Sequence, residues 1–240
     1  MSFLQKILES KKREIEGLYG EKFRFSSALR RSGLSLIAEV KKASPSKGII
    51  RKEFDPVEIA KSFTTAAALS VLTEKEFFLG APEYIRQIKK EAKQPVLRKD
   101  FILDPIQVYE SRLIGADAIL LIKKILTKSQ CQELLNLANQ LGLDVLLELH
   151  DAEELEDIRG MRNIKIIGVN NRNLETFHTD IQLVHTLQPN IRKYFPEALL
   201  VAESGFSKRE ELKRLEEAGI DAVLIGEGLA THPALLSYFG

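Results

Sequence analysis

The chain has 240 residues, of which 29% are charged and 44% are apolar, and its formal net charge is +1. These values exclude a disordered chain, and apolar runs of about five residues exclude a membrane-spanning helix, which needs roughly 20. A net charge near zero gives no field that would attract nucleic acid, and a single cysteine cannot form an internal disulfide. Because the amino terminus also lacks the apolar core of a signal peptide, we expect a cytoplasmic protein without nucleic-acid or membrane partners.

Residues 2–18 predict an amphipathic helix that precedes the first strand. Their apolar side chains recur at helical spacing, and we expect the face that they form to pack on the rest of the domain. A basic helix on a membrane surface is the alternative, but Glu9, Glu14 and Glu16 argue against it. The apolar residues are Phe3, Leu4, Ile7, Leu8, Ile15 and Leu18.

Eight short apolar runs, many of them rich in β-branched residues, predict buried strands. They start about 27 residues apart on average, which leaves room for a helix and two loops after each strand. The predicted strands are Leu36–Val40, Leu69–Thr73, Val96–Lys99, Ala118–Ile122, Val145–Leu149, Lys165–Val169, Leu199–Ala202 and Ala222–Ile225.

The segments between the strands carry signals for helix starts. A proline at or near the first helical position predicts three helices, after Asp55, Ala81 and Asp104. Thr127 is predicted to cap a helix over Gln130–Leu141. Ser207 is predicted to cap another helix, with Glu210 completing a capping box.

Strands that alternate with helices predict right-handed βαβ units and a parallel sheet. Eight such units favour a closed (β/α)₈ TIM barrel over an open sheet, and no Gly-x-Gly-x-x-Gly follows the first strand. Two segments, Gly115–Leu120 and Gly219–Leu224, repeat one pattern in which a glycine ends a helix and an Asp-Ala pair leads into a strand. We expect one domain, with residues 1–33 as an extension and residues 34–240 as the barrel.

Ionisable side chains gather at the predicted carboxyl ends of the strands, where the active sites of such barrels lie. Glu39 and Lys41 end the first strand two residues apart and therefore face the same side of it. Burying several charges close together costs free energy unless they pair, and a barrel does not need them for its stability. The set therefore indicates an active site and not a structural feature. The other charged members are Lys99, Glu148, Arg172 and Glu203, and the amide of Asn170 lies at the end of the sixth strand.

Two glycine-containing turns predict a phosphate site. Glu203–Phe206 leaves the seventh strand and Ile225–Gly228 leaves the eighth, and loops at these two positions usually bind phosphate in this fold. Glycine lets backbone N–H groups approach an anion closely. Ala43–Gly48 follows the first strand and has two interpretations, an ordinary turn or a mobile lid that supplies Ser and Lys to a phosphate.

Five segments together resemble the signatures of the indole-3-glycerol phosphate synthase family: Ile37–Gly48, Leu69–Glu74, Pro95–Ile102, Gly168–Leu174 and Ala202–Gly205. The resemblance runs in order along essentially the whole chain. It implies a (β/α)₈ barrel with no metal or organic cofactor. The implied reaction is the ring closure, decarboxylation and dehydration of 1-(2-carboxyphenylamino)-1-deoxyribulose 5-phosphate to indole-3-glycerol phosphate in tryptophan biosynthesis.

The resemblance also implies catalytic roles for four residues. Lys99 is the general acid that polarises the ketone of the substrate, and Glu148 is the acid or base for the dehydration. Lys41 contacts the phosphate or the carboxylate of the substrate, and the division of proton transfers between the two lysines is left open. Glu39 orients the lysines and favours their protonated form.

Further positions match groups that bind the substrate in this family. Asn170 and Glu203 correspond to residues that hold the sugar hydroxyls and the anilino nitrogen, and Arg172 to a contact on the carboxylate side. The implied phosphate cradle comprises Ser204, Gly205, Gly226, Glu227 and, from the lid, Ser44. The implied apolar wall around the aromatic ring comprises Phe78, Phe101, Leu120 and Leu174.

The chain departs from the family pattern at two places. Thr64–Ala66 stands where the family commonly has a Gly-Ala pair, and Gly228 stands where it commonly has a serine. A missing serine hydroxyl would weaken phosphate binding more than catalysis, since every charged residue that is implied in catalysis is present.

Two alternatives come from other functions of such a barrel. An isomerase of phosphoribosyl anthranilate needs a Cys/Asp pair at strand ends, whereas Cys131 falls on an apolar helix face. A catalytically silent barrel that binds phosphosugars would be expected to lose Lys99 or Glu148 first. The histidines show no metal-ligand spacing, and a structural role is expected for His150, with a place in the site as the alternative. We expect a monomer or a weak homodimer.

Overall fold

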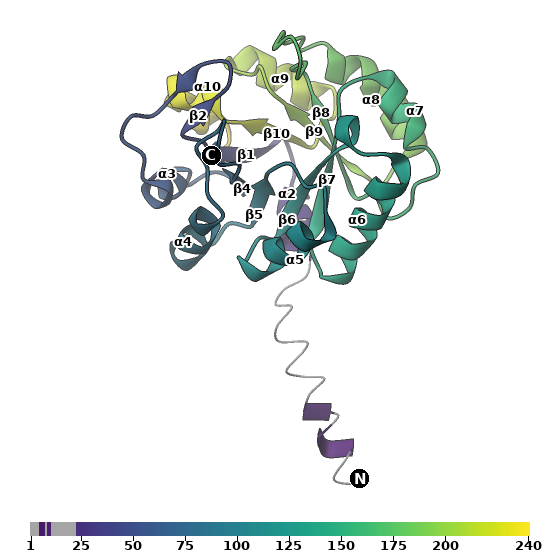
Figure 1. Ribbon diagram of the computed structural model, residues 1–240. Coiled ribbons are helices and arrows are strands. Elements are labelled where there is room, and N and C mark those ends of the chain that lie inside the picture. The colour runs from purple at the N-terminus through teal and green to yellow at the C-terminus, as the bar shows by residue number, and fades with distance from the viewer. Residues whose placement is uncertain (1–4, 8, 11–22) are drawn as a thin grey trace.

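The computed structural model describes residues 5–7, 9–10 and 23–240. Within these residues, eight parallel strands close into a barrel, and helices surround it (Figure 1). The order around the barrel is β1-β10-β9-β8-β7-β6-β5-β4. Barrel strands that are consecutive in the chain are therefore also neighbours in space. The predicted TIM barrel is therefore confirmed. The strands are β1 (Ser35–Val40), β4 (Ala68–Leu72), β5 (Val96–Lys99), β6 (Ala118–Ile122), β7 (Asp144–Leu149), β8 (Ile166–Asn170), β9 (Leu199–Glu203) and β10 (Ala222–Ile225).

Helices follow the barrel strands, and a short hairpin follows the first. The helices are α2 (Arg24–Leu29), α3 (Pro56–Ser62), α4 (Glu83–Glu91), α5 (Pro105–Leu113), α6 (Lys128–Gln140), α7 (Ala152–Asp157), α8 (Leu183–Tyr194), α9 (Arg209–Glu217) and α10 (Glu227–Thr231). Two 3₁₀ helices are η1 (Lys123–Ile125) and η2 (Pro233–Tyr238), and the hairpin pairs β2 (Ala43–Ser44) with β3 (Gly48–Ile49). No helix in the part of the chain described here has the length and apolar character needed to span a membrane.

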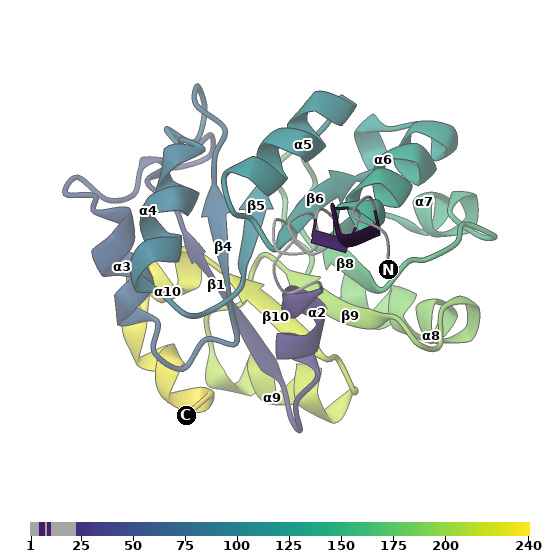
Figure 2. The same ribbon diagram turned by 90° about the horizontal axis from the view of Figure 1, so that it is seen from below.

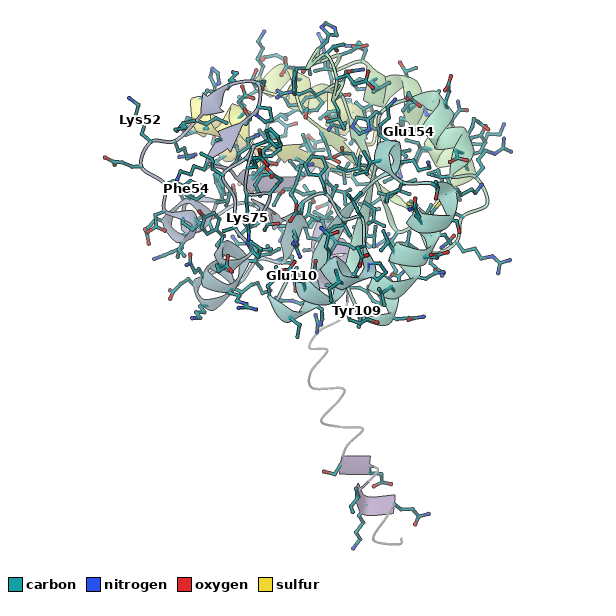
Figure 3. All side chains as sticks on the ribbon, viewed as in Figure 1. Lys52, Phe54, Lys75, Tyr109, Glu110 and Glu154 are labelled. Atoms are coloured by element: carbon teal, nitrogen blue, oxygen red, sulfur yellow. The ribbon has the colours of Figure 1, made fainter. Side chains whose placement is uncertain are left out.

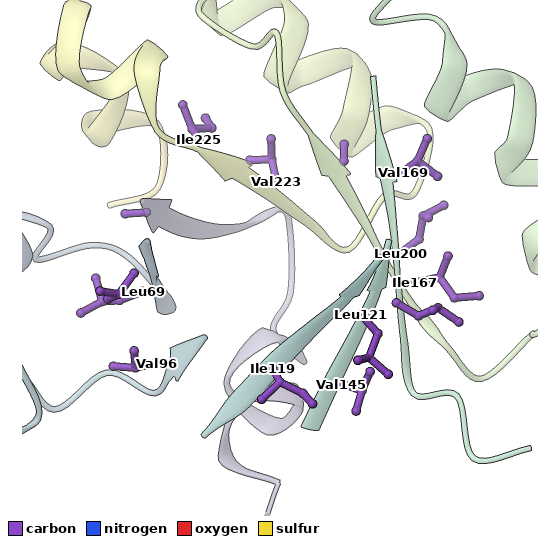
Figure 4. Close-up of a cluster of buried hydrophobic side chains, with 14 of the residues drawn as sticks. Leu69, Val96, Ile119, Leu121, Val145, Ile167, Val169, Leu200, Val223 and Ile225 are labelled. Carbon is purple, nitrogen blue, oxygen red and sulfur yellow. The ribbon is translucent and has the colours of Figure 1, made fainter. Parts of the chain in front are cut away.

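Alternate strand residues build two separate apolar layers, as the two-residue period of a strand requires. Side chains such as Leu69, Ile119 and Val223 face outward and fill the space between strands and helices (Figure 4). Their neighbours, such as Leu97 and Leu146, fill the barrel interior. Because each fully buried Leu or Ile contributes about 1.5–3 kcal/mol, these layers hold the strand ends in place.

Helix α2 closes the end of the barrel where the strands begin (Figure 2). Phe25 and Leu29 are almost fully buried and belong to the interior layer. The backbone N–H of Ser26 donates to the Asp144 carboxylate at 2.8 Å, and the hydroxyl of Ser35 donates to the Leu29 carbonyl at 3.1 Å. Since this end is covered, the opposite end of the barrel is the one open to a ligand.

Three of the predicted helix starts are confirmed by their caps. The carboxylate of Asp55 accepts from Val57 N–H at 2.8 Å, and Asp104 and Thr127 each form a capping box. Helix α6 begins at Lys128, two residues earlier than predicted. Helix α4 begins after Pro82, as predicted.

The predicted cap at Ser207 is wrong. The turn after β9 occupies residues 204–207, so α9 begins only at Arg209, too far along the chain for a Ser207 cap. The carboxylate of Glu211, not that of Glu210, reaches back and accepts from the N–H groups of Ser207 and Lys208 at 2.9 and 3.0 Å.

The repeated Gly-x-Asp pattern has a common structural cause. Gly115 and Gly219 follow α5 and α9 with φ of 90° and 72°, a left-handed conformation that favours glycine. The carboxylates of Asp117 and Asp221 then accept from the N–H groups of Val96 and Leu200 at 2.8 and 2.7 Å. In both cases the aspartate fixes the start of the preceding strand.

The predicted helix over residues 2–18 lies largely outside the described residues. Residues 5–7 and 9–10 are helical and exposed. Whether its apolar face packs on the barrel stays a prediction.

Candidate active site

One cleft opens at the carboxyl ends of the barrel strands. The volume of the cleft, including the part open to solvent, is about 980 Å³. Every side chain or glycine that the sequence analysis placed in the site lines this cleft. The residues are Glu39, Lys41, Ser44, Phe78, Lys99, Phe101, Leu120, Glu148, Asn170, Arg172, Leu174, Glu203, Ser204, Gly205, Gly226 and Glu227.

Lys99 forms the centre of the cleft's charge network. Its Nζ lies 3.0 Å from Glu148 Oε2 and 2.8 Å from Glu203 Oε2, and both carboxylates are buried. Burial opposes the charge on Lys99, but the carboxylates of Glu148, Glu203 and Glu39 outweigh it and raise the pKa of Lys99. Lys99 therefore carries a proton at neutral pH.

The two carboxylates beside Lys99 differ in charge state. Burial works against ionisation of Glu148, but Lys99 and His150 outweigh it and hold the pKa of Glu148 below its usual range. Burial, together with the charge on Glu148, outweighs Lys99 at the other carboxylate and raises the pKa of Glu203 to about 7. One site thus holds a permanent carboxylate and a carboxyl group that titrates near neutrality, which suits it to proton transfer.

Gly168 on β8 makes room for Glu203. A Cβ at this position would lie 2.1 Å from Glu203 Oε1, so only glycine leaves the carboxylate where it is. Glu203 Oε1 itself is buried without a hydrogen-bond partner among the described residues. The sequence analysis missed this role, although a glycine inside a strand is a recognised sign of close approach.

Glu39 and Lys41 form a second ion pair in the cleft, with 2.7 Å between Oε1 and Nζ. A Cβ on Gly226 would lie 2.2 Å from Glu39 Oε1. Gly226 therefore does more than shape the predicted phosphate turn, because it also gives the Glu39 carboxylate its space.

The side chain of His150 is 7% exposed, lies next to Glu148 and does not line the cleft. Its Nε2 lies 3.1 Å from Glu148 Oε1, and its Nδ1 lies 3.6 Å from an oxygen of Glu154, which is labelled in Figure 3. Asn170 Nδ2 donates to the same Glu148 oxygen at 3.2 Å. Burial opposes a charge on the imidazole, but the two glutamates outweigh it and raise the pKa of His150 to about 9. His150 thus helps to keep Glu148 ionised.

The predicted phosphate end of the cleft has free backbone donors. Ser204 and Gly205 have φ of 65° and 94°, and no group among the described residues accepts from their N–H groups. A Cβ on Gly228 would lie 2.3 Å from the Phe206 carbonyl oxygen. The departure from the family's serine at Gly228 therefore matches a backbone that leaves no space for a side chain.

The segment Ala43–Gly48 is an ordered hairpin over the cleft, so the simple turn interpretation is incomplete. The Arg172 guanidinium donates to Ser46 Oγ at 3.2 Å and lies 3.3 Å from Glu227 Oε2. Lys47 forms an ion pair with the same carboxylate. Burial opposes ionisation of Glu227, but the two cations outweigh it and lower its pKa. Whether the hairpin Ala43–Gly48 moves as a lid stays a prediction.

Apolar side chains line the cleft together with the charged groups. The rings of Phe78 and Phe101 lie 6.4 Å apart and line it with Leu120 and Leu174. The sequence analysis missed further lining residues, whose apolar character gave no signal beyond that of core: Leu72, Ile122, Phe177 and Leu224.

A buried arginine next to Lys99 was also missed. Arg98 is 3% exposed, and its guanidinium donates to Thr73 Oγ1 at 3.1 Å, Ser111 Oγ at 3.1 Å and Asp100 Oδ2 at 3.0 Å. These partners come from the ends of β4 and β5 and from α5. Arg98 therefore fixes the strand end that carries Lys99.

Cys131 lies buried on α6 and takes no part in the cleft. Burial raises the pKa of its thiol to about 11, which disfavours the reactive thiolate. The isomerase alternative, which needs a cysteine at a strand end, loses its support. Across the described residues, no three His, Cys, Asp or Glu side chains are grouped so that they could hold a metal ion.

Solved structures of similar fold include the tryptophan synthase α2β2 complex from Pyrococcus furiosus. One chain of that complex matches with a TM-score of 0.58 at 15% identity, covering 87% of this chain and 94% of that one. A mutant tryptophan synthase α-subunit from the same organism matches with a TM-score of 0.60 at 14% identity, covering 87% and 97%. At such identities the likeness concerns the fold.

Sequence comparisons identify the family as well as the fold. The chain is 49% identical to an indole-3-glycerol phosphate synthase of Lachnoclostridium phytofermentans, over 87% of this chain and 76% of that protein. It is 45% identical to one of Chlorobium chlorochromatii, over 99% and 98%. A sequence profile of the indole-3-glycerol phosphate synthase family matches residues 4–236. The chain therefore belongs to the indole-3-glycerol phosphate synthase family, a family of lyases in tryptophan biosynthesis.

Proposed function

We propose that the cleft closes the indole ring of 1-(2-carboxyphenylamino)-1-deoxyribulose 5-phosphate, with Lys99 as the general acid. The observation that carries this assignment is the position of Lys99, between two buried carboxylates at the centre of the cleft. Its ammonium group is held in the charged form, and the same cleft is lined by apolar side chains and by turns with free N–H groups. The substrate has an aromatic ring at one end, which suits the apolar side chains, and a phosphate at the other, which suits the N–H groups.

Ring closure begins when the ring carbon that bears the carboxylate attacks the ketone carbon of the sugar chain. The ketone oxygen gains negative charge as the new bond forms, and Lys99 donates a proton to it. Loss of CO₂ then returns the electron pair to the ring and restores its aromaticity. The apolar wall of Phe78, Phe101, Leu120 and Leu174 favours this step, because an apolar surface disfavours the charged carboxylate relative to CO₂.

Dehydration then forms the pyrrole double bond. The hydroxyl on the former ketone carbon leaves as water after accepting a second proton, and the neighbouring carbon loses a proton to a base. Glu148 is the base that we assign, since Lys99 and His150 keep it ionised at neutral pH. Lys99 or Lys41 supplies the second proton. Two protons are donated and one is removed, so one proton is taken up from solvent as CO₂ leaves.

The remaining groups of the cleft hold the substrate. We assign the phosphate to the N–H groups of Ser204, Gly205, Gly226 and Glu227, with Ser44 from the hairpin. We assign the sugar hydroxyls and the anilino nitrogen to Asn170 and Glu203, and the carboxylate side to Arg172. Glu39 orients Lys41 through their 2.7 Å ion pair.

We also propose that the protein acts in the cytoplasm as a monomer or weak homodimer of one barrel domain, without a nucleic-acid partner. The net charge of +1 supports the absence of nucleic acid. Sedimentation equilibrium would test the oligomeric state.

The test of the catalytic assignment is Lys99→Met, which keeps an apolar stem and removes the ammonium group. Indole fluorescence reports the product directly, since the chain has no tryptophan. We expect kcat to fall about 10²–10⁴-fold, the usual contribution of a general acid, while binding of inorganic phosphate changes less than about twofold. Retention of more than about a tenth of the activity would exclude Lys99 as the acid.

A matched control is Lys123→Met. Lys123 is also buried and ion-paired, at 2.9 Å from Asp157, but it does not line the cleft. We expect turnover within about twofold of the unmodified protein. If the unmodified protein binds phosphate but forms no product, the catalytically silent barrel replaces the proposed function.

A further inference from the structure

Asn171 joins two parts of the cleft without lining it. The side chain is 3% exposed, and its Nδ2 donates to the carbonyl oxygens of Glu203 at 3.0 Å and Ser204 at 3.1 Å. Its Oδ1 accepts from the N–H of Val184 at 3.2 Å, near the start of α8. Both amide hydrogens and the amide oxygen therefore have partners, as a buried amide requires.

The two carbonyls that Asn171 holds lie on either side of a strained residue. Ser204 has φ of 65°, and this left-handed conformation is unfavourable for residues other than glycine. The backbone N–H of Asn171 also donates to the Glu203 carbonyl, at 3.0 Å. Three hydrogen bonds from one residue thus fix the chain where it leaves β9 and oppose relaxation of Ser204.

The turn fixed in this way carries two different functions. Glu203, just before it, places its carboxylate 2.8 Å from Lys99 Nζ. Ser204 and Gly205, within it, present N–H groups that no described residue accepts from. A movement of this turn would change the distance between the proton-transfer groups and the phosphate donors.

We propose that Asn171 is a positioning residue that clamps the Glu203–Ser204 turn. It sets the separation between the site of proton transfer and the phosphate, and so determines where the ketone of the bound substrate lies relative to Lys99. This inference rests on the proposed function, because it concerns the same substrate.

The test uses Asn171→Asp, which keeps an oxygen for Val184 N–H and places a carboxylate oxygen against the two carbonyls. Calorimetry with inorganic phosphate measures the binding end of the cleft, and indole fluorescence gives kcat and KM. We expect the phosphate Kd and the KM each to rise about 10–30-fold, the effect of losing one or two hydrogen bonds. Asn139→Asp on α6 adds the same charge outside the cleft and should change neither value by more than about twofold.

A second background separates positioning from simple stabilisation. In Ser204→Gly the left-handed turn costs little, so the clamp matters less. We expect Asn171→Asp to raise the phosphate Kd about threefold or less in that background. An equal loss in both backgrounds, or an unchanged Kd in Asn171→Asp alone, would overturn the proposal. If Asn171→Asp does not fold, Asn171→Ala gives the same comparison without the added charge.

The proposed function fails separately. If the unmodified protein forms no indole product, the proposed function is contradicted, while the phosphate measurements still decide whether Asn171 clamps the turn.

Discussion

Replacing Gly168 by alanine tests whether the position of the Glu203 carboxylate limits catalysis. The new Cβ would lie 2.1 Å from Glu203 Oε1 and 3.2 Å from Leu146 Cδ1. Since a Cβ atom does not approach a non-bonded oxygen closer than about 3 Å, the carboxylate must retreat by about 1 Å or the strands must separate. Lys99 contacts the other oxygen of this carboxylate, Oε2, at 2.8 Å, and we expect either movement to lengthen this contact.

The magnitude follows from this displacement. A misplacement of about 1 Å at a reacting group can cost about 10²-fold in rate, so we expect kcat to fall by that factor. Overpacking a buried site costs about 1–3 kcal/mol, and we expect the free energy of unfolding to fall within this range. Initial rates from indole fluorescence and urea unfolding followed by circular dichroism measure the two effects.

A double-mutant cycle identifies the cause. Glu203→Asp shortens the side chain by one methylene and withdraws the carboxylate from the space that the new Cβ needs. The stability cost of Gly168→Ala should therefore drop below about 1 kcal/mol in the Glu203→Asp background. An equal cost in both backgrounds, or a kcat within about threefold of the unmodified protein, would refute the reasoning.

Two further predictions concern the other ion pairs of the site. Gly226→Ala places a Cβ 2.2 Å from Glu39 Oε1 and should break the Glu39–Lys41 ion pair. We expect kcat to fall about tenfold or more, while the Kd of inorganic phosphate changes less than about threefold. A change in phosphate affinity without a change in kcat would contradict the role of Gly226 in making room for Glu39. His150 has its pKa raised to about 9, so its charge stabilises the fold fully below pH 6.5, and this contribution is lost as the pH rises through 9. Urea unfolding measures the free energy of unfolding of His150→Gln and of the unmodified protein. The difference between the two proteins should be up to about 3 kcal/mol larger at pH 6 than at pH 10. A difference that grows as the pH rises would contradict the raised pKa of His150.

The positions of the strands and of several helices could be predicted from the sequence, because their signals are local. Apolar runs predicted the eight barrel strands within a residue or two, and proline and capping residues predicted the starts of α3, α4, α5 and α6 within two residues. The charged residues of the cleft were also predictable, since chemistry in this fold lies at the carboxyl ends of strands, whereas its apolar wall was expected only from the family resemblance. The start of α9 was not, because Ser207 and Glu211 offer competing caps and the turn after β9 decides between them.

Only the tertiary structure decided what surrounds the reacting groups. Gly168 and Asn171 act on partners that β9 and α8 bring to them, and nothing in their own segments identifies those partners. The different charge states of Glu148 and Glu203 likewise depend on burial and on a lysine they share from β5. Sequence periodicity reports which side of an element is buried, whereas the free energy of a buried charge depends on distances of about 3 Å between segments far apart in the chain, which exist only once the barrel has closed.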